Sequence, residues 1–61
     1  MTNDMKSIKR NSDGVIFNIG DKIIDELVPG GAPITGFDKE DDILLIVTDY
    51  GMIPLNRATK I

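Results

Sequence analysis

The sequence predicts an all-β fold, a small and strongly bent barrel of about five strands with at most one short 3₁₀ or helical turn. Short segments rich in β-branched residues alternate with turn signals, such as Asp13-Gly14 and residues 49–51. No segment carries the sustained 3.6-residue periodicity of a long helix. The chain has 61 residues, too few for a sandwich of two large sheets, whereas a bent barrel covers one core and leaves few strand edges. We therefore expect a single domain over residues 1–61, with residues 1–6 flexible.

The first predicted element is a β-hairpin that turns at Asp13-Gly14, a dipeptide typical of tight turns. Residues 8–10 precede the turn and supply its first strand. After the turn, Val15, Phe17 and Ile19 recur at every second position, which is the pattern of a half-buried strand. We expect these three side chains to face the core.

Residues 22–28 admit two interpretations. Their apolar positions suit one or two helical turns, but they also suit a strand that continues after a kink at Gly20. The β-branched residues between Val15 and Ile24 favour a strand through Ile24, and a helical turn stays open as the alternative. Residues 29–33, which contain two prolines and two glycines, exclude a helix and a central strand and predict a loop.

A short strand (residues 34–37), a charged turn (residues 38–42) and a long apolar strand (residues 43–48) are predicted next. We expect Ile43, Leu45 and Val47 to face the core. The intervening side chains, Leu44 and Ile46, then need cover from strand coiling, from a loop or from a second copy of the chain.

The chain is predicted to close with a strand over residues 52–55, a single 3₁₀ turn and a final pairing. Pro54 has no N–H group, so its nitrogen must face a sheet edge or a break. If Ile53 and Leu55 face inward, Met52 and Pro54 face outward at period two.

Composition excludes several classes of function. The chain has neither cysteine nor histidine, so it lacks disulfides, thiolate metal cages and the usual nucleophile–base pairs. We therefore expect a non-enzymatic chain without metal or cofactor. The longest apolar run, residues 43–47, is far shorter than the roughly 20 residues of a membrane helix, and the polar start shows no secretory signal, which favours the cytoplasm. The net charge of −3 argues against a dedicated nucleic-acid binder.

Two segments, in this order and spacing, resemble an SH3 domain. Residues 17–23 (FNIGDKI) are similar to the segment in which an apolar strand meets a Gly-acidic turn, and residues 51–56 (GMIPLN) are similar to the closing Gly-x-Ile-Pro-x-Asn segment. The resemblance implies a five-stranded SH3-like barrel in which Pro54 and Asn56 stand where the family builds its aromatic groove for Pro-rich peptides. Arg57 replaces the usual Tyr and the chain has no Trp. The resemblance therefore implies a divergent bacterial or phage type without the polyproline groove.

Two sets of residues are candidates for binding a protein partner. Tyr and Arg are favoured interface anchors and Met adapts to varied surfaces. The first set lies in the closing segment: Tyr50, Met52, Pro54, Asn56 and Arg57. Burial of Tyr50 as a cap on the core is the alternative for that residue. The second set lies in the charged turn and suits a basic partner: Asp38, Asp41 and Asp42.

These observations lead to three hypotheses about function. The first is a non-catalytic protein-binding module, a small bacterial or phage accessory or inhibitory protein that docks on a larger protein or a nucleic-acid-handling enzyme. The second is a barrel of the KOW or Tudor kind that binds nucleic acid through Lys6, Lys9 and Arg10. The third is a structural subunit that self-associates, in the simplest case as a homodimer.

Overall fold

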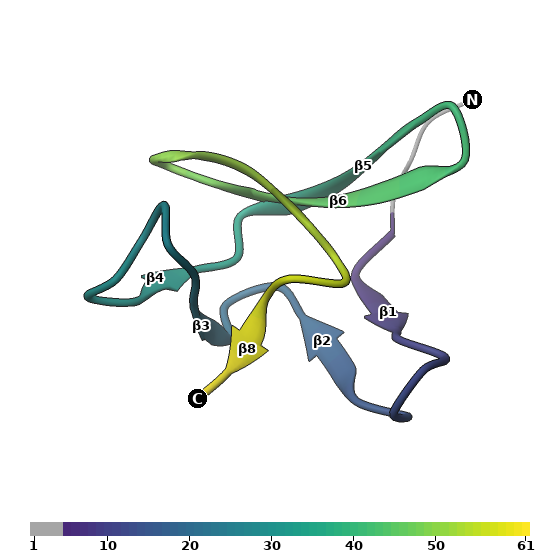
Figure 1. The fold of residues 1–61 in the computed structure, drawn as a ribbon, viewed down its shortest axis with the longest axis horizontal. Helices are drawn as coiled ribbons and strands as arrows, with labels where there is room; N and C mark the ends of the chain where they lie inside the picture. The colour runs from purple at the N-terminus through teal and green to yellow at the C-terminus, as the bar shows by residue number, and fades with distance from the viewer. Residues whose placement is uncertain (1–4) are drawn as a thin grey trace.

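A computed structural model describes residues 5–61, and within that range the chain is all-β, as predicted, with no helix (Figure 1). The strands are short and are joined by turns: β1 (Ser7–Lys9), β2 (Ile16–Asn18), β3 (Lys22–Ile24), β4 (Ala32–Pro33), β5 (Gly36–Glu40), β6 (Ile43–Thr48), β7 (Gly51–Pro54) and β8 (Thr59–Lys60). The expectation of flexibility over residues 1–6 concerns mostly residues 1–4, which lie outside the described residues. The Lys6 carbonyl accepts a hydrogen bond from the Ile19 N–H at 3.1 Å, which ties the start of β1 to the end of β2.

The strands form three small antiparallel sheets, β1-β2, β4-β3-β8 and β5-β6-β7, and none of them closes into a barrel. The predicted five-stranded barrel is thus not confirmed. At Gly20, where the sequence predicted a kink within a strand that continues to Ile24, the chain makes a full turn between β2 and β3, and Gly20 adopts a φ of +94°. Figure 1 shows the β5–β6 hairpin along the top of the view, with the strands of the other two sheets below it.

The first hairpin is confirmed. Ile8 pairs with Phe17, and the turn between them is closed by a hydrogen bond from the Gly14 N–H to the Arg10 carbonyl at 2.7 Å. Gly14 has a φ of +76°, a conformation that favours glycine. The predicted alternation holds only in part: Phe17 is fully buried, but Ile19 is exposed because the chain already turns there.

Residues 25–28 are neither strand nor helical turn. The strand ends at Ile24, as favoured, and a bend follows in which the Asp25 carboxylate accepts the Leu27 N–H at 3.1 Å. The Val28 N–H donates to the Asp25 carbonyl at 3.0 Å and closes the bend. Val28 is buried by this arrangement, whereas Leu27 stays exposed.

The long apolar strand, β6, spans residues 43–48 as predicted, but the expected face was wrong. Ile46 is fully buried and pairs with Phe37 on one side and with Ile53 on the other. Directly paired residues share a face, so the odd-numbered positions of β6, expected in the core, point outward. Ile43 in particular is 56% exposed.

The closing segment follows the prediction in its facing and in its final pairing, but the strand spans Gly51–Pro54 and an ordinary turn over residues 55–57 takes the place of the expected 3₁₀ turn. Ile53 and Leu55 are buried and Met52 is exposed. The Leu55 N–H donates to the Leu44 carbonyl, so the neighbouring Leu45–Pro54 pair is not hydrogen-bonded and the Pro54 nitrogen faces the open edge of β7. A turn closed by the Arg57 N–H and the Pro54 carbonyl then leads into β8, which pairs with β3.

One apolar core lies between the three sheets. Its largest fully buried side chains come from every part of the chain: Phe17, Ile23, Ile34, Ile46 and Ile53. Across residues 5–61, no helix has the length and the apolar character that crossing a membrane requires.

Candidate functional site

The outward side of the β5-β6-β7 sheet carries an apolar surface. The register places Leu45 opposite Pro54 and Val47 opposite Met52, all on the side away from the core. Met52 is 52% exposed, while Leu45, Val47 and Pro54 are half-buried by their neighbours. We call this surface the outer sheet face and define it by seven residues: Asp38, Glu40, Ile43, Leu45, Val47, Met52 and Pro54.

An acidic column borders the apolar residues on the β5 side. Asp38 pairs with Leu45 and Glu40 pairs with Ile43, so both carboxylates project from the same face as these apolar side chains. Asp38 lies inside strand β5 and not in the turn where it was expected. The turn itself consists of two exposed acidic residues, Asp41 and Asp42, and Asp41 has a left-handed φ of 56°.

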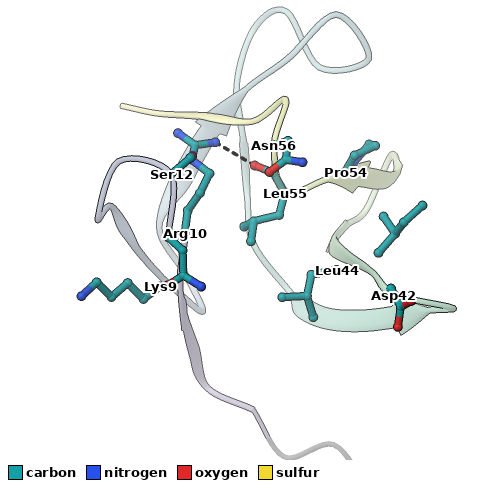
Figure 2. A pocket seen from close by; sticks show the side chains of 10 residues that line it. Lys9, Arg10, Ser12, Asp42, Leu44, Pro54, Leu55 and Asn56 are labelled. Atoms are coloured by element: carbon teal, nitrogen blue, oxygen red, sulfur yellow. Dashed lines mark hydrogen bonds between the residues drawn. The ribbon is translucent and has the colours of Figure 1, made fainter.

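A pocket of about 270 Å³ opens at the end of the sheet, between the first hairpin and β7. It joins residues from both binding hypotheses (Figure 2), and its lining comprises Lys9, Arg10, Asn11, Ser12, Asp42, Ile43, Leu44, Pro54, Leu55 and Asn56. Arg10 reaches from the hairpin to the closing segment, whereas Lys9 extends away from the pocket. The two basic residues therefore have different roles.

Arg10 holds the closing segment to the first hairpin. Its Nη1 donates to the carbonyls of Leu55 and Ala58, both at 2.7 Å. Its Nε and Nη2 donate to the two carboxylate oxygens of Asp13 at 3.1 and 2.8 Å. The guanidinium also lies over the Phe17 ring, 5.0 Å from its centroid. With its side chain 12% exposed and its donors engaged, Arg10 is a structural residue.

The electrostatics of this contact agree with its geometry. The hydrogen bond from the Arg10 guanidinium lowers the pKa of the Asp13 carboxyl, and the Val15 N–H, which donates to the same carboxylate, adds to that effect. The same hydrogen bond raises the pKa of Arg10.

A second carboxyl, that of Asp21, also has a lowered pKa. The larger cause is the backbone N–H of Asn18, and the next is Lys60, whose Nζ lies 3.0 Å from the carboxylate.

The candidates of the closing segment divide into three places. Met52 and Pro54 belong to the outer sheet face, and Pro54 also lines the 270 Å³ pocket together with Asn56. Arg57 donates to the buried carboxylate of Asp25 at 2.8 Å and so fixes the bend at residues 25–28. Tyr50 does not cap the core.

Tyr50 is 67% exposed and lies in the turn between β6 and β7. It lines a shallow apolar pocket of about 210 Å³ together with residues 27–31. Phe17 and Phe37 are both buried in the core. Tyr50 is therefore the one aromatic side chain of the sequence that solvent reaches freely.

The basic candidates for nucleic-acid binding do not form one patch. Lys6 and Lys9 are exposed, but the Arg10 guanidinium is turned inward onto carbonyls and a carboxylate. Within residues 5–61, no three acidic side chains come together in an arrangement that would hold a metal ion.

Sequence reasoning missed four residues of the outer sheet face: Glu40, Ile43, Leu45 and Val47. The sequence does contain a signal for the facing of β6. Asp49-Tyr50 is a two-residue turn, which sets the register so that Ile46 lies opposite Ile53. If Ile53 faces inward, Ile46 then faces inward too, and the odd-numbered residues of β6 face outward.

Comparison with protein-family models, with curated proteins and with solved structures finds no significant match for this chain.

Proposed function

We propose that this chain is a non-catalytic protein-binding module that docks on a larger protein through the outer sheet face. The observation that carries the proposal is the exposure of Ile43 and Met52 on one side of a sheet whose other side packs on the core. Contiguous apolar surface of this kind marks interaction sites in small soluble proteins. A sheet face is also partly preorganised, because the backbone pairing fixes the direction in which each side chain leaves the sheet before the partner arrives.

An SH3-like organisation belongs to the same proposal. The three-stranded meander β5-β6-β7 is followed by a turn at residues 55–57, and β8 then pairs with β3 from the first half of the chain. This order of elements supports the resemblance of the GMIPLN segment to the closing segment of SH3 domains. The polyproline groove of that family is not part of the proposal, because Phe17 and Phe37 are buried.

Two features favour a protein partner over nucleic acid. Arg10, the residue best suited to phosphate, spends its donors within the chain. The chain has ten acidic residues against seven basic ones, and a phosphate backbone would be repelled by the acidic column beside the apolar surface. We place the module in the cytoplasm, in keeping with a chain that has no cysteine.

The test is affinity capture from a bacterial lysate with the tagged full chain, in nuclease-treated and untreated halves. The Ile43→Ser/Met52→Ser variant removes the two exposed apolar anchors of the outer sheet face. The matched control, Ile16→Ser/Ile61→Ser, removes two isoleucines of comparable exposure that lie outside this face. We expect a stoichiometric protein that survives nuclease and moderate salt, is retained by the control and is lost with the face variant.

Each other outcome contradicts the proposal in its own way. Bound material that disappears with nuclease would favour the KOW- or Tudor-like alternative, and charge reversal at Lys6 and Lys9 should then abolish it. Recovery of only the chain itself would favour the self-associating subunit. A partner that the face variant retains as well as the control does would move the binding site away from this sheet.

A further inference from the structure

The outer sheet face carries charge and apolar surface in separate columns. The β5 column consists of Asp38 and Glu40. The β6 column consists of Ile43, Leu45 and Val47, and the β7 column consists of Met52 and Pro54. Neighbouring columns are about 4.8 Å apart, and successive residues of one column are about 6.7 Å apart. The apolar surface is therefore about 13 Å long, the length that about five extended residues cover.

We propose that the partner presents a basic segment to this face, with apolar side chains on the β6 and β7 columns and Lys or Arg side chains over the β5 column. This inference rests on the proposed function and adds the chemistry of its partner. The argument is charge complementarity, because Asp38 and Glu40 have no basic neighbour within salt-bridge distance among residues 5–61. A cationic segment would neutralise both carboxylates while its apolar side chains cover Ile43 and Met52.

The same charges disfavour a second copy of this chain as the occupant. A two-fold pairing of outer sheet faces whose axis runs across the strands would place the acidic column of each copy over that of the other. Any pairing of two copies also joins two chains that each carry a net charge of −3. Like charges at such an interface oppose association. The two exposed acidic residues of the adjoining turn, Asp41 and Asp42, extend the negative potential beyond the strand.

The experiment is an NMR titration of the ¹⁵N-labelled full chain with three capped five-residue peptides, in which lysine, serine or glutamate alternates with leucine. We expect saturable amide shifts over residues 43–54 with the lysine peptide, in about the millimolar range because the face is much smaller than a standard interface. Binding should weaken steeply between about 0.1 M and about 1 M salt, as the screening length falls from about 10 Å to about 3 Å. The glutamate peptide should not bind.

Two charge-reversal variants separate a specific site from general attraction to an acidic protein. Asp38→Lys/Glu40→Lys acts on the β5 column, and Glu26→Lys/Asp49→Lys makes the same change in net charge at exposed positions outside it. We expect the first variant to weaken lysine-peptide binding by about tenfold or more and the second by much less. Dispersed amide spectra of both variants verify the fold.

Three results would overturn the inference: no saturable binding of the lysine peptide, shifts centred elsewhere, or equal weakening by the two variants. They leave the proposed function untouched if the captured partner still depends on Ile43 and Met52. Conversely, loss of that dependence refutes the docking surface itself, whatever the peptides do. The two failures are therefore distinguishable.

Discussion

The two sides of the β5-β6-β7 sheet differ in where their polar groups are used. On the inner side, Ile46 and Ile53 are buried, and Arg10 closes the end of the core by bonding to the carbonyls of Leu55 and Ala58. On the outer side, apolar side chains remain exposed beside acidic residues that find no cation within salt-bridge distance in the described part of the chain. The Arg10 guanidinium thus stabilises the fold, whereas Lys6 and Lys9 stay exposed. Isoleucines of one strand, Ile46 and Ile43, thus differ in role because they point to opposite sides of the sheet.

The largest expected difference between the two sides is in the free energy of unfolding lost when an isoleucine of β6 is shortened. Ile46→Ala should lower the free energy of unfolding by about 2–5 kcal/mol, because it leaves a cavity in a core that supplies only about 3–5 kcal/mol in a domain of this size. That variant will be largely unfolded in circular dichroism spectra and urea titrations.

Two conservative substitutions, one on each side of β6, leave the protein folded, so that the free energy of unfolding can be measured for both. Ile46→Val should cost about 0.5–1.5 kcal/mol and Ile43→Val less than about 0.5 kcal/mol, because only the first methyl group is buried. Equal losses would mean that the odd-numbered face of β6 is also covered, and the distinction between the two sides would fail.

The next effect tests Arg10 as the residue that closes the inner side. Arg10→Ala removes two hydrogen bonds to backbone carbonyls, the pair with Asp13 and the contact with Phe17, and should cost about 1–3 kcal/mol in urea unfolding. Lys9→Ala, one residue away with an exposed side chain, should change stability by less than about 0.5 kcal/mol. If Lys9→Ala cost as much as Arg10→Ala, the inward role of the guanidinium would be wrong.

Local signals in the sequence predicted most of the elements but not the way they join. The Asp13-Gly14 hairpin, the extent of β6 and the outward nitrogen of Pro54 follow from turn chemistry and periodicity, which act between near neighbours. The five-stranded barrel is not confirmed, because the short strands pair as three separate sheets. At Gly20, where a kinked strand was expected, a positive φ turns the chain between β2 and β3. A lone glycine in a strand pattern predicts a kink, a bulge or a break equally well.

The candidate site was harder to predict than the fold. Met52 and Pro54 were placed on the outer side because Ile53 and Leu55 were assigned to the core together. Both faces of β6 are apolar, so periodicity alone does not indicate which face points outward, and the outward residues Ile43, Leu45 and Val47 were not predicted. The role of Arg10 depends on carbonyls 45 and 48 positions away in the chain, and no local pattern encodes such a contact.

The smallest effect is a pH dependence that sharpens the account of the inner side. The pKa of Asp13 is lowered in the folded chain by its hydrogen bond with Arg10, below an unfolded value of about 3.9. The stability that this pair contributes is therefore complete above that value and is lost as the pH falls through the folded pKa. Asp13→Asn should be less stable than the wild type near neutral pH, and the difference should shrink in urea titrations as acid protonates Asp13. In the Arg10→Ala background, the substitution should have little pH-dependent effect, and a difference that persists unchanged there would assign the lowered pKa of Asp13 to the Val15 N–H instead.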